Sequence, residues 1–225
     1  GSTASLHDSN TDCVNCLLGK YADFAGHSNC KICASGQYTS DDQSESCQSC
    51  ATGKYISDDS QDSSKHDNVN DCTDCLAGTF ATSMGSSHCS ICPFGKWSGQ
   101  TSKVCTDCAA GKYLSDTASD EKLHDTESDC EICGAGTWSG SSTKNCKSCD
   151  AGTYLSDSGA NVLLHDEASD CNVCPGGKWS NMGFSVCTNC DKGRYLDDTG
   201  TSSVAHDSQT DCAICAAGTY GGLGT

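Results

Sequence analysis

Large apolar side chains occur one at a time along this chain, each at the same place in a repeated phrase. The phrase is Cys-x-x-Gly-x-aromatic and occurs eleven times, as in Cys75-Leu-Ala-Gly-Thr-Phe80. Glycine at a fixed position indicates a turn that needs a positive φ or a close backbone approach. We therefore expect strands of two to four residues around each Gly-x-aromatic, and turns at the Ser, Asp and Gly clusters. We expect no helix of note, because even the most helix-like stretch, 161–165, is very short.

The cysteines divide the chain into short and long units. All 22 cysteines lie in Cys-x-x-Cys pairs, and successive pairs follow at steps of 16, 17 or 25 residues. Long units end in His-Asp-x-x-x-Asp-Cys, which begins at His7, His66, His124, His165 and His206. Tryptophan occurs only in short units, and each aromatic is expected to pack over an adjacent cysteine bridge as a local core.

The composition excludes an ordinary globular core. Only 35% of the 225 residues are hydrophobic and 6% are aromatic, and the hydrophobic count includes the 22 cysteines. A globular domain of this length normally buries a substantial aliphatic core. A chain so polar would be disordered without crosslinks. The cysteine density therefore indicates a disulfide scaffold in an oxidising compartment, and we expect an extracellular or cell-surface protein.

The charge limits the partners. The formal net charge is -17 and the only arginine is Arg194. Such a surface repels nucleic acid and anionic membranes, and no apolar run is long enough to insert into a bilayer. We expect the chain to associate with itself, head to tail or laterally, or with other extracellular proteins.

Several roles for the cysteine pairs compete. A four-cysteine zinc site has similar spacing, but the alternating 25-residue steps would then serve no purpose. Redox motifs occur once, at a helix start, and eleven copies do not fit. An interlaced disulfide scheme, with Cys13–Cys30 and Cys16–Cys33, would strand a whole pair. A ladder, in which the second cysteine of one pair bonds the first of the next, strands one cysteine at each end. We favour the ladder, although sequence alone leaves connectivity open.

The ladder predicts ten closed units. Its bridges are Cys16–Cys30, Cys33–Cys47, Cys50–Cys72, Cys75–Cys89, Cys92–Cys105, Cys108–Cys130, Cys133–Cys146, Cys149–Cys171, Cys174–Cys187 and Cys190–Cys212. The units are 16–30, 33–47, 50–72, 75–89, 92–105, 108–130, 133–146, 149–171, 174–187 and 190–212, flanked by a partial tail at 1–13 and a partial head at 215–225. A loop of this size gains roughly 3 kcal/mol from one crosslink, so ten bridges compensate for a missing core.

The phrase resembles a known kind of extracellular repeat. The stretch Cys16-Leu-Leu-Gly-Lys-Tyr-(x8)-Cys30-Lys-Ile-Cys33 is similar to the cysteine-rich modules of tumour-necrosis-factor receptors, and more so to ephrin-receptor-like repeats. The resemblance covers nearly the whole chain. It implies an elongated, solenoid-like rod of small disulfide-rich repeats with short β-hairpins, and it implies little about a ligand. The His-Asp-x-x-x-Asp-Cys units depart from the receptor pattern.

The two partial units complement each other. Cys13 lacks a preceding partner and Cys215 lacks a following one in the ladder. Either the chain is a window of a longer array, or copies join head to tail and complete a unit across the junction. We expect Cys13 and Cys215 to lie at such a junction.

The acidic residues of the long units admit two interpretations. Closing each loop could bring three aspartates together as oxygen ligands for Ca²⁺. The sets are Asp58, Asp67 and Asp71; Asp116, Asp125 and Asp129; Asp157, Asp166 and Asp170; and Asp198, Asp207 and Asp211. The simpler interpretation, which we favour, is that the aspartates cap backbone N–H groups and the histidine packs beside the aromatic of the next unit.

These features predict a structural protein. No catalytic residue set appears, so we expect no enzyme and no required cofactor, with Ca²⁺ as the one candidate. The leading hypothesis is an extracellular structural repeat, a subunit or segment of a fibre or surface coat assembled head to tail. The alternative is a receptor-like or adhesive ectodomain that binds a protein ligand. Exposed Ser and Thr could carry O-linked sugar.

Overall fold

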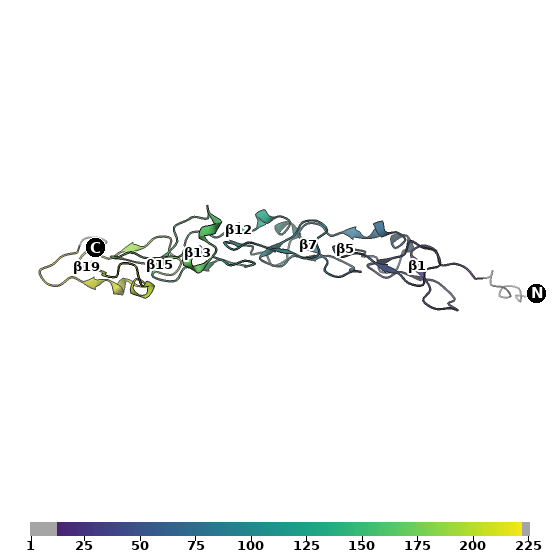
Figure 1. The fold of residues 1–225 in the computed structure, drawn as a ribbon, viewed down its shortest axis with the longest axis horizontal. Helices are drawn as coiled ribbons and strands as arrows, with labels where there is room; N and C mark the ends of the chain where they lie inside the picture. The colour runs from purple at the N-terminus through teal and green to yellow at the C-terminus, as the bar shows by residue number, and fades with distance from the viewer. Residues whose placement is uncertain (1–12, 222–225) are drawn as a thin grey trace, which may run out of the picture. The chain divides into compact units, whose positions relative to one another are not determined.

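The fold is a series of two-stranded hairpins. The computed structural model describes residues 13–221, and in that part of the chain twenty two-residue strands form ten antiparallel pairs (Figure 1). The pairs are β1 (Lys20–Tyr21) with β2 (Lys31–Ile32), β3 (Gln37–Tyr38) with β4 (Gln48–Ser49), β5 (Lys54–Tyr55) with β6 (Thr73–Asp74), β7 (Thr79–Phe80) with β8 (Ser90–Ile91), β9 (Lys96–Trp97) with β10 (Thr106–Asp107), β11 (Lys112–Tyr113) with β12 (Glu131–Ile132), β13 (Thr137–Trp138) with β14 (Lys147–Ser148), β15 (Thr153–Tyr154) with β16 (Asn172–Val173), β17 (Lys178–Trp179) with β18 (Thr188–Asn189), and β19 (Arg194–Tyr195) with β20 (Ala213–Ile214).

Short 3₁₀ helices occur in the long units. They are η2 (Ser63–Lys65), η3 (Val69–Asp71), η4 (Glu121–Leu123), η5 (Glu127–Asp129), η6 (Val162–Leu164), η7 (Ala168–Asp170), η8 (Ser203–Ala205) and η9 (Gln209–Asp211). Helix η6 falls inside the stretch that the sequence marked as most helix-like, and the Asn161 side chain accepts the N–H of Leu163 at its start. The predicted class, small disulfide-rich repeats without a helix of note, is confirmed.

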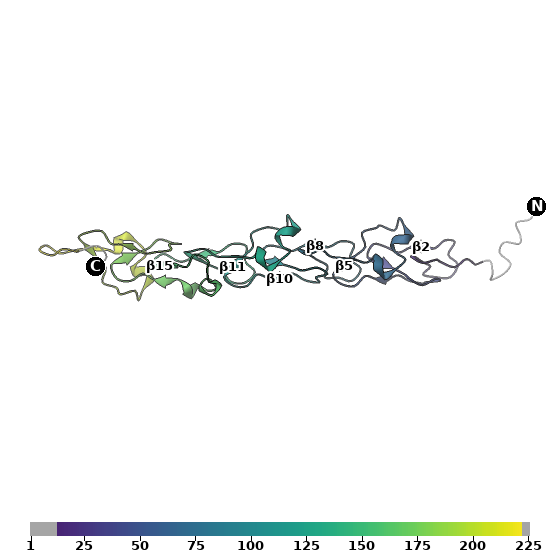
Figure 2. The same ribbon diagram turned by 90° about the horizontal axis from the view of Figure 1, so that it is seen from above.

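The chain divides into two compact units. The first comprises Gly1–Cys92 and Ser98–Cys105, and the second Pro93–Trp97 and Thr106–Thr225. Within each unit the hairpins follow one another in chain order (Figure 2). We call each disulfide-closed loop a module and name it by its two bridged cysteines, as in module 50–72.

Ten disulfides close the modules. They are Cys16–Cys30, Cys33–Cys47, Cys50–Cys72, Cys75–Cys89, Cys92–Cys105, Cys108–Cys130, Cys133–Cys146, Cys149–Cys171, Cys174–Cys187 and Cys190–Cys212. These are the pairs of the ladder scheme, and the interlaced pairs do not occur. Bridged cysteines therefore provide neither zinc ligands nor redox-active Cys-x-x-Cys pairs.

Each hairpin uses the two parts of the cysteine phrase. The Gly-x-aromatic segment supplies the first strand, and the two residues between the next pair of cysteines supply the second, as in β1 and β2. The Gly19 carbonyl then accepts the N–H of Cys33 at 3.0 Å. The glycine has a φ of 75°, a left-handed conformation that other residues adopt at a cost. The fixed glycine thus turns the chain into the strand and anchors the second cysteine.

One backbone hydrogen bond repeats between neighbouring modules. The glycine N–H of each phrase donates to the carbonyl of the residue that follows the aromatic in the next module. Examples are Gly36 N to Ile56 O at 2.9 Å and Gly136 N to Leu155 O at 2.8 Å. The same bond occurs from each of the ten glycines from Gly19 to Gly193. We call it the glycine rung. It docks each module onto its neighbour, as in solenoid proteins.

The apolar cores are small and lie between modules. Cys50, Ile56 and Cys72 form one buried cluster, and Tyr38 of the preceding module packs against it. Trp97 and Trp179 cover equivalent clusters in modules 108–130 and 190–212. The expectation that an aromatic packs over an adjacent disulfide is confirmed at these three places. In each case the disulfide belongs to the module after the one that contains the aromatic residue.

We predict that Gly136→Ala destabilises the second unit by at least about 2 kcal/mol, because the φ of +75° and a close backbone contact both exclude a side chain. A Cβ at this position would lie 2.1 Å from the Gly183 carbonyl oxygen. The matched control is Gly134→Ala, where nothing lies within 4 Å of the added atom. Amide hydrogen exchange of modules 133–146 and 149–171, with disulfides intact, measures the effect. Equal protection in the two variants would contradict this account of the glycine.

Candidate functional site

The most specialised contacts of the molecule involve four buried histidines. His66, His124, His165 and His206 have no exposed surface. Each Nδ1 lies 2.6–2.7 Å from the carbonyl oxygen of the residue before the aromatic in the preceding module. For His66 that oxygen belongs to Gln37. A carbonyl oxygen only accepts, so Nδ1 donates. Each long module is thus clamped to the module before it by a side chain.

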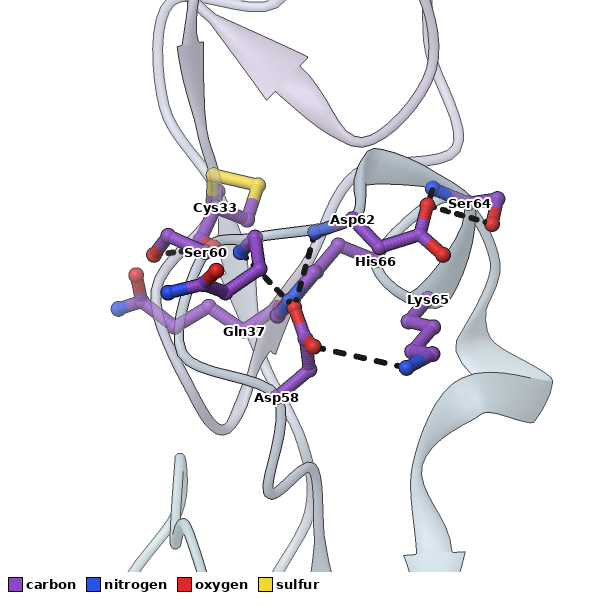
Figure 3. Close-up of polar contacts among 10 residues, drawn as sticks. Cys33, Gln37, Asp58, Ser60, Asp62, Ser64, Lys65 and His66 are labelled. Carbon is purple, nitrogen blue, oxygen red and sulfur yellow. Dashed lines mark hydrogen bonds and ion pairs between the residues drawn. A yellow bond between two sulfur atoms is a disulfide. The ribbon is translucent and has the colours of Figure 1, made fainter.

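The other ring nitrogen meets an aspartate of the same module. His66 Nε2 lies 3.1 Å from Asp58 Oδ2 (Figure 3). Asp58 also accepts the backbone N–H groups of Gln61 and Asp62, and Lys65 Nζ lies 3.6 Å from its second oxygen. The other histidines pair with Asp116, Asp157 and Asp198 at 3.0 Å. We call this unit of carbonyl, imidazole and carboxylate the histidine clasp.

The clasp holds its carboxylates in the charged form. Each histidine ring lies between two oxygen atoms, with a backbone carbonyl at Nδ1 and a carboxylate at Nε2. Hydrogen bonds from the following loop lower the pKa of these carboxyl groups. The largest cause is the Ser119 side chain for Asp116 and a backbone N–H for the other three. For Asp157 the largest cause is the N–H of Asn161, followed by His165. The clasp is therefore a charge-assisted hydrogen bond, because its carboxylate is ionised.

Serine performs the corresponding task in three of the six short modules, 92–105, 133–146 and 174–187. Ser139 Oγ donates to the Lys112 carbonyl at 2.9 Å, and Ser180 Oγ donates to the Thr153 carbonyl at 2.8 Å. Ser98 does the same to Thr79 at 3.0 Å. The receiving carbonyl is again that of the residue before the aromatic in the preceding module. From module 92–105 to module 190–212 the donor therefore alternates between serine in short modules and histidine in long ones.

The sequence analysis did not predict these hydrogen bonds from serine to the preceding module. Each of these serines directly follows a tryptophan, as in Trp97-Ser98, Trp138-Ser139 and Trp179-Ser180. The equivalent position in long modules is apolar, as with Leu155. This alternation between a small hydroxyl and a large aliphatic side chain is visible in the sequence and is the signal that could have revealed the contact.

The expected position of the histidine was wrong. The sequence suggested that it packs beside the aromatic of the next unit, whereas its ring bonds back to the preceding module. The reason is the loop closure by Cys50–Cys72, which places His66 beside strand β3. The predicted capping by aspartate occurs at two of the three positions in each set.

The structure assigns different tasks to the aspartates of each proposed calcium set. The first, such as Asp58, belongs to the clasp. The third accepts a backbone N–H at the start of a 3₁₀ helix: Asp71 from Asn68, Asp129 from Thr126, Asp170 from Glu167 and Asp211 from Ser208. The second positions are Asp67, Asp125, Asp166 and Asp207. Burial, followed by the nearby Asp170, raises the pKa of Asp166. Residues 13–221 contain no group of three or more His, Cys, Asp or Glu side chains placed to hold a metal ion.

The two cysteines expected at a junction are both free. Cys13 is exposed and Cys215 is partly buried, and neither forms a disulfide. The other residues of the predicted partial tail at 1–13, including His7, lie outside the described residues.

Comparison with known proteins gives no family. No protein-family model matches the chain, and no curated protein matches it. The structure itself shows tandem cysteine-rich repeats, and ten disulfides indicate an extracellular or secreted protein. Across the described residues, none of the helices has the length and apolar character needed to cross a bilayer.

We predict that acid weakens the clasp. The pKa of Asp157 is lowered in the folded chain. The ionised Asp157 carboxylate therefore contributes fully to stability above the ordinary aspartate pKa of 3.8, and this contribution is lost as the pH falls below 3.8 through the lowered pKa. The thermal unfolding midpoint, measured with disulfides intact, should fall below pH 4 less steeply in Asp157→Asn than in the unmodified chain. Asp150→Asn, at an exposed position, is the control and should keep the original slope. Parallel curves for all three proteins would contradict the prediction.

Calcium binding stays a prediction of the sequence. Titration calorimetry of the folded chain with Ca²⁺, repeated on Asp67→Asn, tests it most directly. Heat that disappears in the variant would support a site in module 50–72. The absence of heat and of any thermal shift would remove the calcium hypothesis.

Proposed function

We propose that this chain is an extracellular structural element, a subunit or segment of a fibre or cell-surface coat built by head-to-tail docking of modules. The observation that carries the proposal is the glycine rung, which repeats in every module from Gly19 to Gly193. Each module offers the same donor to the next and the same acceptor to the previous one. Such uniformity suits an extended array, whereas a ligand-binding site would set one or two modules apart.

The covalent path also supports a load-bearing role. Each disulfide joins cysteines separated by 13, 14 or 22 positions while their Cα atoms lie only 5.6–5.8 Å apart. Tension along the chain would pass through the bridge and the two residues between paired cysteines, bypassing the loop. The loops, with their clasps and caps, would remain unstressed.

The proposal agrees with the resemblance to tumour-necrosis-factor-receptor-like and ephrin-receptor-like repeats, which are extracellular and modular. No described cluster of side chains has the form of a catalytic centre, and we propose a non-enzymatic role. Clusters of exposed Ser and Thr on the loops offer acceptors for O-linked sugar, which an intact-mass measurement of native material would detect.

Electron microscopy of native material, labelled with an antibody against the chain, tests the function. We expect label along fibres or a continuous surface layer. Label restricted to isolated molecules in complex with a soluble protein would contradict the proposal and favour the receptor-like alternative.

Single-molecule stretching tests the load path. Without reductant, the chain should extend without releasing loop residues. With reductant, we expect steps of two sizes, about 45 Å for short modules and about 75 Å for long ones, from 3.3–3.6 Å per extended residue. A variant that lacks one of the four long bridges, Cys149→Ser with Cys171→Ser, serves as control and should lose one long step. Release of loops of both sizes without reductant would contradict the load path.

A further inference from the structure

The four long modules are closed by equivalent bridges, and one of these bridges is less buried than the others. Each long bridge joins cysteines separated by 22 positions. The cysteine that opens the module is fully buried in all four. The cysteine that closes it is 4% exposed at Cys72, 4% at Cys130 and 0% at Cys212, whereas Cys171 is only partly buried. Solvent therefore reaches the bridge of module 149–171 from one side.

A hollow of about 200 Å³ lies against this bridge. Its lining includes Cys171, Trp138, Lys147, Asp150 and Thr153. The hollows beside modules 50–72 and 108–130 are lined by other residues, and neither reaches a bridged cysteine. One water molecule takes about 30 Å³ in the liquid. The hollow beside Cys171 thus has room for a molecule of a few non-hydrogen atoms.

The cause of the incomplete cover lies in the preceding hairpin. Trp138 is the aromatic residue before module 149–171, in the position from which other aromatic residues cover a long bridge. The register of β13 and β14 places Lys147 opposite Trp138, and Lys147 Nζ lies 5.0 Å from the centroid of the Trp138 ring. A cation at this distance attracts the face of the ring. The ring accordingly packs with the lysine and leaves part of the Cys149–Cys171 bridge uncovered.

The three covered bridges lack such a cation. Tyr38, Trp97 and Trp179 each pack against the buried cluster of the long module that follows. The residues opposite them in their hairpins are uncharged, namely Gln48, Thr106 and Thr188. The exposed bridge and the cross-strand lysine therefore occur together, in the same one of four equivalent places.

From the exposed cysteine, the hollow and the lysine, we propose that the Cys149–Cys171 bridge is a thiol–disulfide exchange site that takes a small, uncharged monothiol. Accessible bridges are the ones that thiols reduce most readily. Lys147 lines the hollow, and a nearby cation stabilises both an attacking and a leaving thiolate. Asp150 is the other charged residue named in the lining, and it repels thiols that carry a further negative charge.

The exchange takes place in two steps. The thiolate of the monothiol attacks Cys171 Sγ, the bond between the two cysteines breaks, and Cys149 leaves as a thiolate that takes up a proton. A second monothiol attacks the small-molecule sulfur of the mixed disulfide and releases Cys171, which also takes up a proton. Two monothiols are thereby oxidised to one small disulfide, and the two cysteines gain two electrons and two protons.

Exchange at this bridge opens the array at one defined point. The freed loop contains the His165 clasp and the two 3₁₀ helices η6 and η7. In the load path proposed above, tension would then pass through this loop, while the other long modules stay closed. The inference goes beyond the proposed structural role, because the reactivity of the bridge does not require assembly into a fibre or coat.

The test uses the 225-residue chain, folded with its ten disulfides and with its free thiols blocked by N-ethylmaleimide. The chain is incubated with dilute 2-mercaptoethanol, and samples are quenched with iodoacetamide for peptide mass spectrometry. We expect Cys149–Cys171 to be reduced about tenfold faster than the other three long bridges, with the 2-mercaptoethanol adduct on Cys171. The comparison is among long bridges, because their loops have equal length. Equal rates, or an adduct on Cys149, would overturn the proposal.

Two lysine variants test the role of the hollow. Lys147→Thr copies the residue found opposite Trp97 and Trp179, and we expect it to slow the reduction of Cys149–Cys171 about fivefold. Lys144→Thr removes the same charge from an exposed position of the same short module, and it should leave the rate unchanged. An unchanged rate in Lys147→Thr, or an equal loss in both variants, would refute the part assigned to Lys147.

The rate of reduction in urea separates attack in the hollow from attack after unfolding. Attack on the folded module predicts a rate that hardly changes at low urea concentrations. A rate that rises steeply with urea would mean that unfolding exposes the bridge, and it would overturn the proposal. Antibody label on a fibre or coat, combined with an unreactive bridge, would refute the exchange site and leave the proposed function standing.

Discussion

The structure depends on covalent bonds between consecutive cysteine pairs. A hairpin of two-residue strands is too small to fold alone in water, and the clusters around Ile56, Leu114 and Leu196 each bury one aliphatic side chain and two cysteines. The bridge holds both ends of a loop at a Cα separation of less than 6 Å, which makes the hairpin's hydrogen bonds local. Because each Cys-x-x-Cys pair closes one loop and opens the next, the position of every module fixes the start of its neighbour.

Two kinds of contact then build on the bridges. The glycine rung is made by backbone alone and is the same at every step. The side-chain contact alternates from module 92–105 onward, with an imidazole from long modules and a hydroxyl from short ones directed at equivalent carbonyls, such as those of Thr137 and Lys112. A buried histidine between a carbonyl and a carboxylate is stabilising only while the carboxylate is charged. The long modules therefore combine an apolar contact with an electrostatic one, whereas the short modules rely on packing and neutral hydrogen bonds.

The sequence predicted the features that depend on spacing. The cysteine steps led to the ten bridges, and the fixed glycine led to the positive φ and the short strands. It did not predict the partner of His66, because the carbonyl of Gln37 lies 29 positions away and comes close only through loop closure. It also missed the task of Ser139, whose hydroxyl meets a carbonyl 27 positions earlier. Contacts of this kind depend on how neighbouring modules stack, which the spacing of cysteines does not encode.

The glycine rung is the same between every two neighbouring modules, and this uniformity has a consequence for the evolution of such a protein. Donor and acceptor are backbone groups at fixed positions, so a duplicated or deleted module meets the same surface on either side as the one it replaces. Unequal recombination within the coding sequence would change the number of repeats without disturbing the rest. Lineages that carry this kind of chain should accordingly differ more readily in length than in the spacing inside a repeat.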